Sequence, residues 1–313
     1  MLRMNRRTLL AGVSAALVTR SFAEQIHGAF GAKSTAEEVT QGLDLRGKTA
    51  VVTGCNSGLG LESMRVLAMR GAHVIGTART LEKGREACAQ MKGHTTPVVL
   101  ELADFPSVVE CAKKVRALTS QIDILMLNAG IVLEKLEQVG GLEKQFVVNH
   151  LGHFILAHRV LDLVHSSKQG RVVTVGSGSH TSVPPGGIQF DNLSGAGWFH
   201  KGYGHSKLAN GLFSLELSRR FAGTRATSNC LTPGPVDTKI RRNMAAPPAR
   251  EEKTVQQGAA TQCYLATNPM LAKTTGEYFK DCNPAPQSDF QRDTAMAEKL
   301  WALSTQLTQK YLG

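Results

Sequence analysis

The chain has 313 residues, of which 42% are hydrophobic and 19% are charged, so its composition is that of a folded soluble protein and excludes a largely disordered one. Its length suits one α/β domain with terminal extensions. The formal net charge is +11, but the first 23 residues hold four arginines and no acidic residue, and without those arginines the charge is +7. The remaining Lys and Arg residues are scattered among few aromatic residues, which argues against a nucleic-acid partner.

The first 23 residues have the features of an export signal. Asn5–Leu10, with its paired arginines, resembles the bacterial twin-arginine motif, and the apolar stretch Leu9–Val18 is too short to span a bilayer. Small residues at Ser21 and Ala23 suit cleavage after Ala23. We therefore expect residues 1–23 to be a twin-arginine-type signal, so that the protein is periplasmic or exported and meets the membrane only during export. If the leader is not used, the protein is cytoplasmic.

From about Gly47 onward, short β-branched runs alternate with longer amphipathic stretches. In chain order, the predicted strands are Ala50–Thr53, His73–Thr77, Pro97–Leu102, Ile122–Leu127, Arg171–Gly176, Ala226–Leu231 and Glu277–Lys280. Helices are predicted between the first six strands, at Leu59–Arg70, Leu81–Met91, Ser107–Leu118, Glu143–Val164 and Tyr203–Phe221. Continuous apolar strands joined by helices are typical of a parallel sheet that is covered on both faces. The sequence thus predicts one doubly wound, seven-stranded, Rossmann-like α/β domain over residues 46–313, with its ligand beyond the carboxyl ends of the strands.

Two stretches interrupt this alternation. Residues 24–45 lack strong periodicity and are interpreted as a linker or extension before the domain. Residues 234–255 contain three prolines and mixed charges, and an insertion after the sixth strand lies over the ligand crevice, so this segment is the expected substrate lid. Its apolar and basic residues suit a lipophilic alcohol or an anionic carbonyl compound.

The six cysteines are widely spaced and form neither a CxxC motif nor a cluster with histidine, so no metal site is predicted. They are Cys55, Cys88, Cys111, Cys230, Cys263 and Cys282. Most lie in apolar stretches and are expected to be buried free thiols. A disulfide between Cys263 and Cys282 is an alternative for this pair, because disulfide pairing cannot be deduced from sequence.

A glycine-rich loop connects the first predicted strand to the first predicted helix. It has the spacing TGxxxGxG, and its candidate cofactor-binding residues are Gly54, Asn56, Ser57, Gly58, Leu59 and Gly60. Glycines let the backbone turn sharply and approach a pyrophosphate, whose charge is met by free N–H groups and the helix dipole. The loop therefore predicts a dinucleotide site.

Tyr203 and Lys207 lie four residues apart on a predicted helix, hence on one face. An ammonium there is expected to favour the phenolate and to lower the pKa of Tyr203 toward working pH. Such a tyrosine can protonate a developing alkoxide or take a proton from an alcohol. The pair predicts acid–base chemistry at a carbonyl or alcohol.

Together with this loop and this pair, further segments resemble the short-chain dehydrogenase/reductase family over roughly Gly47 to Cys282. The matching residues are Asn128-Ala129-Gly130 after the fourth strand, Asn149, Ser177 after the fifth strand, and Pro233, Gly234, Val236 and Thr238 after the sixth. Within the family, the segments around Asn149, Tyr203 and Glu277–Cys282 look most similar to retinol dehydrogenases and WW-domain oxidoreductases.

The resemblance implies a role for each matched residue. Tyr203 would be the proton donor or acceptor, Lys207 would also hold the nicotinamide ribose, Ser177 would bond the substrate oxygen, and Asn149 would hold a water that links Lys207 to solvent. The remaining matched residues would bind the cofactor: Asn128, Ala129, Gly130, Pro233, Gly234, Val236 and Thr238. Family members often associate through the helices that bear Asn149 and Tyr203, so a homo-oligomer is a further expectation.

Cofactor preference is decided at the end of the second strand. An acidic residue there binds a ribose 2′-hydroxyl, whereas an arginine pairs with a 2′-phosphate. The sequence has no carboxylate at this tip and has Arg79, so NADP(H) is preferred over NAD(H). After the third strand, Glu101-Leu102 stands where the family commonly has Asp-Leu, which leaves adenine contact by Glu101 open.

The leading hypothesis is an NADP(H)-dependent oxidoreductase that interconverts a small-molecule alcohol and a carbonyl compound. A catalytically silent NADP-binding protein is one alternative, for which a broken tetrad would be the signature. An isomerase or lyase of the same superfamily is another, but those proteins usually carry a differently spaced glycine loop and a larger carboxyl-terminal region.

Overall fold

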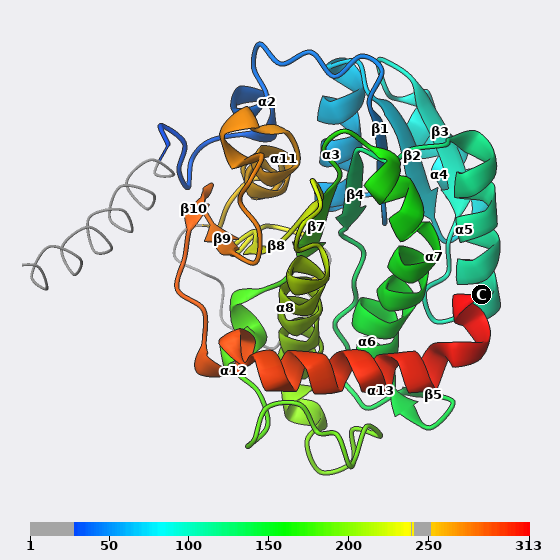
Figure 1. Ribbon diagram of the computed structural model, residues 1–313, viewed down its shortest axis with the longest axis vertical. Coiled ribbons are helices and arrows are strands. Elements are labelled where there is room, and N and C mark those ends of the chain that lie inside the picture. The colour runs from blue at the N-terminus through cyan, green and yellow to red at the C-terminus, as the bar shows by residue number, and fades with distance from the viewer. Residues whose placement is uncertain (1–27, 239, 241–251) are drawn as a thin grey trace, which may run out of the picture.

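An eight-stranded sheet forms the centre of the computed structural model, which describes residues 28–238, 240 and 252–313 (Figure 1). Its strands are β1 (Thr49–Val52), β2 (His73–Ala78), β3 (Thr95–Val99), β4 (Ile124–Leu127), β7 (Arg171–Val175), β8 (Thr227–Thr232), β9 (Tyr278–Lys280) and β10 (Asn283–Pro284). Their order across the sheet is β10-β9-β8-β7-β4-β1-β2-β3. The predicted doubly wound α/β fold is confirmed. The seven predicted strands pair in parallel, and the two-residue β10 adds an antiparallel edge.

Helices cover both faces of the sheet, and the side chains of β1 divide between the two layers. Ala50 and Val52 belong to one hydrophobic cluster, whereas Val51 belongs to the other, because successive strand residues point to opposite faces. The first layer contains α3 (Gly58–Met69), α10 (Val255–Gly258) and α11 (Ala260–Thr267), and the second contains α5 (Phe105–Leu118), α7 (Gly152–Ser166) and α8 (Gly202–Arg220). The short helix α4 (Leu81–Ala89) packs beside β2 and β3.

The single helix predicted over 143–164 is divided into three parts. α6 (Lys144–Phe146) is followed by a π-helical segment at Val147–Leu151 and then by α7. Glu143 begins the element, since its buried carboxylate accepts hydrogen bonds from the backbone N–H groups of Gln145 and Phe146. Single π-helical turns often mark functional sites, and this one contains Asn149.

The segment before the sheet packs on the domain. α2 (Ala36–Val39) begins with a capping box in which Thr35 and Glu38 bond each other's backbone N–H groups. Ala36 and Val39 are buried in the same cluster as α11, and the two helices lie side by side (Figure 1).

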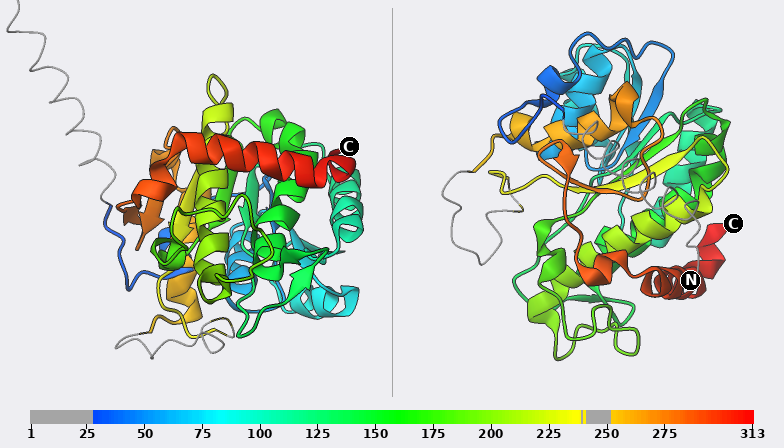
Figure 2. Two further views of the ribbon diagram at one scale, coloured as in Figure 1. Left: turned by 90° about the horizontal axis from the view of Figure 1, so that it is seen from below. Right: turned by 60° about the vertical axis from the view of Figure 1, so that its left-hand side comes forward.

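The carboxyl-terminal helix α13 (Thr294–Leu312) follows the short α12 (Asp289–Arg292) and runs across α8 and α7 (Figures 1 and 2). Trp301 stacks on Phe213 of α8 with the two ring planes 1° apart, and Ser304 shares a 2.7 Å hydrogen bond with the buried His150. This helix was not predicted from the sequence.

Two predicted segments lie wholly or mostly outside the described residues. The predicted signal 1–23 is one, and the predicted lid 234–255 is described only at its ends. Those ends meet, because Val236 and Lys253 form a parallel β-bridge. Within the described ranges, no helix is long and apolar enough to cross a membrane. All six cysteines are free thiols.

Candidate active site

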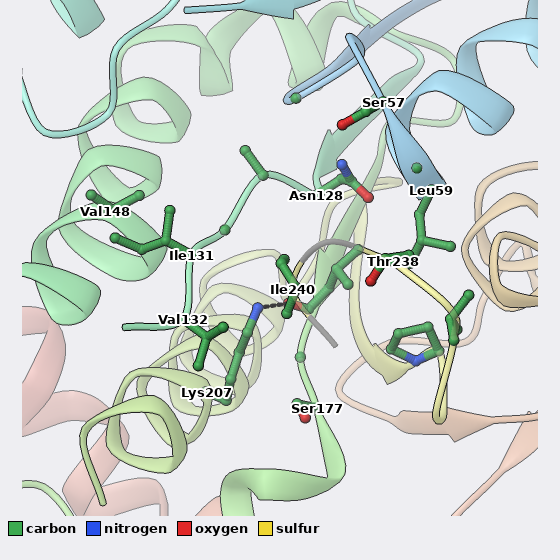
Figure 3. A pocket seen from close by; sticks show the side chains of 18 of the residues that line it. Ser57, Leu59, Asn128, Ile131, Val132, Val148, Ser177, Lys207, Thr238 and Ile240 are labelled. Carbon is green, nitrogen blue, oxygen red and sulfur yellow. Dashed lines mark hydrogen bonds between the residues drawn. The ribbon is translucent and has the colours of Figure 1, made fainter. Parts of the chain in front are cut away.

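A cavity of about 1400 Å³ lies along the carboxyl ends of the strands, where the sequence placed the ligand. Of the residues that the sequence assigned to catalysis or cofactor binding, it is lined by Gly54, Asn56, Ser57, Gly58, Leu59, Arg79, Glu101, Leu102, Asn128, Ala129, Gly130, Ser177, Tyr203, Lys207, Pro233, Gly234, Val236 and Thr238. Figure 3 shows Ser57 and Asn128 toward one side of the cavity, and Lys207 and Ser177 toward the other. Gly60 and Asn149 lie behind this lining.

The glycine loop needs its glycines for two different reasons. Gly54 and Gly58 have φ values of +74° and +58°, a region that side chains other than glycine rarely adopt. Gly60 has ordinary backbone angles, but a Cβ atom there would lie 2.3 Å from the carbonyl oxygen of Gly54. The loop can therefore close tightly at the start of α3. Ser57, the N-cap residue, makes no side-chain capping bond, which leaves the first N–H groups of α3 available to an anion.

Asn128 fixes the turn after β4 against the end of β1. Its side-chain amide donates to the Thr53 carbonyl oxygen at 2.8 Å, and its backbone N–H donates to the Thr53 hydroxyl at 2.9 Å. Gln262 of α11 also contributes, since its Nε2 donates to the Asn128 Oδ1 at 3.3 Å and to the Ser63 hydroxyl at 2.7 Å. Sequence reasoning missed Gln262, because no motif marks it and its partners are far away in the chain.

Asn149 supports the neighbouring turn. Its Oδ1 accepts from the backbone N–H of Ile131 at 2.8 Å, while its Nδ2 donates to the Ile131 carbonyl and to the Ser206 hydroxyl at 3.0 and 2.9 Å. Both amide hydrogens are therefore used within the protein. Asn149 holds the chain segment after β4 in place from behind the cavity.

Tyr203, Lys207 and Ser177 come together at the β7 end of the cavity. Lys207 Nζ donates to the Val175 carbonyl at 2.9 Å and lies 5.7 Å from the centre of the Tyr203 ring. Ser177 follows β7, and its hydroxyl accepts from the backbone N–H of Ser179 at 3.1 Å. The helix α8 thus presents Tyr203 and Lys207 to the strand end that carries Ser177.

The expectation that the pKa of Tyr203 is lowered is wrong for the protein without bound cofactor or substrate. Burial raises the pKa of Tyr203 to about 12, and a hydrogen bond with the Ser177 side chain opposes this only in part. Burial also lowers the pKa of Lys207 to about 8. Both shifts have the same physical cause, since a site shielded from water disfavours the charged form of each group.

His180 and Tyr278 complete the wall beside Ser177. His180 is buried, its Nδ1 lies 2.8 Å from the Ser177 carbonyl oxygen, and its ring meets the Tyr278 ring edge-on with centroids 5.0 Å apart. The contact between Nδ1 and a carbonyl oxygen means that this nitrogen carries the proton. The sequence analysis gave Tyr278 no role in the site, although its position in the alternating strand β9 could have indicated one.

The opposite end of the cavity, at β2 and β3, is lined by Arg79, Lys83 and Glu101. Arg79 and Lys83 are exposed, and neither forms an ion pair within the described part of the chain. Thr80 caps α4 between them. The carboxylate of Glu101 accepts from the backbone N–H of Ala103 at 3.0 Å, so it is partly engaged by its own loop.

The family model for short chain dehydrogenases matches residues 48–249 of this chain. Among curated relatives, the short-chain dehydrogenase TIC 32 A of Brassica napus is 39% identical, with 90% of this chain and 94% of the relative covered. The WW domain-containing oxidoreductase of Homo sapiens is 37% identical over 90% and 72%. Retinol dehydrogenase 12 of Bos taurus is 36% identical over 85% and 87%.

Solved structures agree with the fold. A crystal structure of an uncharacterized protein from Mycobacterium paratuberculosis superposes with a TM-score of 0.72 at 32% identity, over 87% of this chain and 97% of that one. A Beutenbergia cavernae protein with bound NADP at low occupancy has a TM-score of 0.59 at 25% identity, over 75% and 95%.

Proposed function

The chain belongs to the short-chain dehydrogenase/reductase family, and we propose that within it the protein interconverts an alcohol and an aldehyde or ketone with NADP(H), using Tyr203 as the general acid and base. Membership makes it an oxidoreductase that acts on CH–OH groups of small molecules with NAD(P). The choice of NADP(H) and the roles of individual residues are the proposal.

One observation carries this function: Tyr203, Lys207 and Ser177 converge at one end of a cavity whose other end is lined by the glycine loop and Arg79. In carbonyl reduction, the Tyr203 hydroxyl donates its proton to the developing alkoxide, and in alcohol oxidation the phenolate accepts one. Ser177 hydrogen-bonds the substrate oxygen. The bound nicotinamide supplies or receives the hydride.

The site fits a dinucleotide. The cavity exceeds the 300–1,000 Å³ that small ligands usually occupy, so it has room for a dinucleotide and a substrate together. Gly54 and Gly58 adopt backbone angles that bring the main chain close to a pyrophosphate, and the start of α3 offers N–H groups to its charge. Asn128, Ala129 and Gly130 line the path from this loop to Lys207, which would hold the nicotinamide ribose.

Arg79 supports the preference for NADP(H). It lines the adenosine end, where the ribose 2′-phosphate would lie, and Lys83 in the first turn of α4 lines the same end. Both cations lack a carboxylate partner in the described ranges, so a phosphate would meet unneutralised charge.

A nucleotide-loaded protein without turnover is the second candidate, and the arrangement of Tyr203, Lys207 and Ser177 argues against it. An isomerase or lyase is disfavoured by the TGxxxGxG spacing of the loop. Export through the twin-arginine leader, a lipophilic substrate and a homo-oligomer remain predictions that accompany the proposed function.

The test is to purify the chain from Glu24 onward and to follow NADPH absorbance with a panel of aldehydes and ketones, and NADP⁺ reduction with the matching alcohols. We expect turnover with NADP(H), and weaker activity with NAD(H). Tight nucleotide binding without turnover of any carbonyl or alcohol would instead establish the binding-protein alternative.

A further inference from the structure

Strand β9 forms the outer wall of the cavity beyond Ser177. It carries Lys280, which lies away from the nucleotide end of the cavity. In the sheet, β9 lies two strands beyond β7, whereas Arg79 and the glycine loop lie on the other side of β4. A cofactor that runs from Arg79 to Lys207 therefore leaves the β9 wall to the substrate.

The register of β9 places two of its side chains on this wall. Tyr278 pairs with Cys230 and Lys280 pairs with Thr232, so Lys280 is level with the carboxyl end of β8. Tyr278 and Lys280 are two residues apart and share one face of the strand, and both line the cavity. Phe279 between them points to the other face and is fully buried in the core.

Lys280 is not neutralised by the carboxylates around it. It is exposed, and it forms no ion pair within the described residues. The adjacent Asp281 pairs with Lys253 instead. Asp237 lines the same cavity but already has an interaction of its own. An ammonium at the edge of the substrate end thus remains available to a ligand.

A second cavity lysine shows the contrast. Lys144 also lines the cavity, but its Nζ lies 2.7 Å from a Glu137 carboxylate oxygen, so its charge is met by the protein. The segment Ile131–Leu133, which follows β4, adds an apolar part to the lining. The substrate end therefore combines apolar surface with one cation that has no protein partner in the described ranges.

We infer that this end of the cavity takes an aldehyde, ketone or alcohol with an apolar body and a carboxylate that pairs with Lys280. The inference rests on the proposed function, because it names the substrate class of the same site. An exposed ion pair contributes modestly, so the preference over a neutral analogue should be about fivefold in kcat/KM.

A matched pair of aldehydes tests it: 4-carboxybenzaldehyde and the neutral methyl 4-formylbenzoate, both with NADPH. Lys280→Gln should lower kcat/KM for the carboxylate about fivefold and leave the ester within about twofold. Lys280→Arg should keep the preference, and Lys273→Gln, which removes an exposed lysine outside the cavity lining, should change neither value. Equal losses for both aldehydes in Lys280→Gln, or no loss for either, would overturn the inference and leave the proposed oxidoreductase function standing.

A binding measurement reads the same contact without turnover. Calorimetric titration of the NADPH complex with 4-carboxybenzyl alcohol, a pair in which both molecules are already reduced so that no hydride can move, should give an affinity about fivefold weaker in Lys280→Gln, and high salt should reduce this difference. Equal affinities, or no binding to either protein, contradict the inference. Binding that depends on Lys280 in a protein that turns over no aldehyde would support the inference while the proposed function fails.

Discussion

Lys207 is a buried amine whose pKa of about 8 lies close to working pH, because burial disfavours its ammonium. The charged form is therefore present below about pH 8 and is lost as the pH rises through that value. If Lys207 holds the ribose as an ammonium, kcat/KM for NADPH should be level below about pH 8 and then fall about tenfold per pH unit. A pH profile of the initial rate measures this. In Lys207→Arg the side chain stays charged, so the decline should vanish even though the activity is lower.

We propose that the preference for NADP(H) depends on Arg79. In Arg79→Gln we expect KM for NADPH to rise about tenfold, as expected from losing a charged hydrogen bond at an exposed site, while KM for NADH stays the same. Arg85→Gln is the matched control, since Arg85 is exposed on α4, the helix that follows Arg79, but does not line the cavity. An equal rise for both nucleotides would mean that Arg79 supports the fold and does not read the 2′-phosphate.

The side chain of Arg171 links two elements, the start of β7 and the end of α11. Its guanidinium is buried and donates to the carbonyl oxygens of Leu265 and Asn268 at 3.0 and 2.8 Å. The Leu265 carbonyl lies in the last turn of the helix, where intrahelical donors run out, whereas the Asn268 carbonyl also accepts from the backbone N–H of Leu271 at 3.2 Å. Arg171→Met should cost about 2 kcal/mol in the free energy of unfolding, because it leaves the Leu265 carbonyl unsatisfied and removes one of the two hydrogen bonds to the Asn268 carbonyl. Chemical denaturation measures this, with the exposed Arg225→Met expected to change stability by less than about 0.5 kcal/mol. Equal stability of the two variants would show that water replaces the cap.

Elements that carry a clear local sequence pattern were predictable, and elements without one were not. The strand β4, with Ile124 to Leu127 all apolar, and the glycine loop were recognisable because each carries a local pattern. Helix α13 was missed, since its buried face consists of Ala297, Leu300, Ser304 and Thr308 and is half polar. The π-helical turn at Asn149 was missed because the spacing of apolar residues looks the same for an α-helix with or without one added residue in a turn. The motif residues that line the cavity were predictable for the same local reason. Gln262 and Lys280 were not, because their positions beside the cavity follow from long-range contacts and from the order of the strands.

His150, His153 and His205 are buried in neutral form, and among the histidines that the structure describes their pKa values are lowered furthest. Burial lowers the pKa of His150 and His205 to about 3 and that of His153 to about 4. The unfolded chain binds these protons near pH 6.5, so stability is complete above that value and is lost as the pH falls toward the folded-state pKa values. At pH 5 each histidine should cost about 2 kcal/mol relative to pH 7.

Denaturant titrations at several pH values measure this loss. His150→Asn should reduce the difference between pH 7 and pH 5 by about 2 kcal/mol, even if it lowers stability overall. If the wild-type protein is as stable at pH 5 as at pH 7, the three histidines are not buried as neutral groups.

Tyr203→Phe tests most directly whether Tyr203 moves the proton. Initial rates of carbonyl reduction with NADPH would be measured for the wild type, for Tyr203→Phe and for Tyr264→Phe, which alters a buried tyrosine outside the cavity. We predict that Tyr203→Phe lowers kcat about a thousandfold, leaves NADPH affinity within about twofold, and differs in this from Tyr264→Phe. Retention of near wild-type turnover in Tyr203→Phe, with nucleotide bound normally, would show that Tyr203 is not the general acid and base.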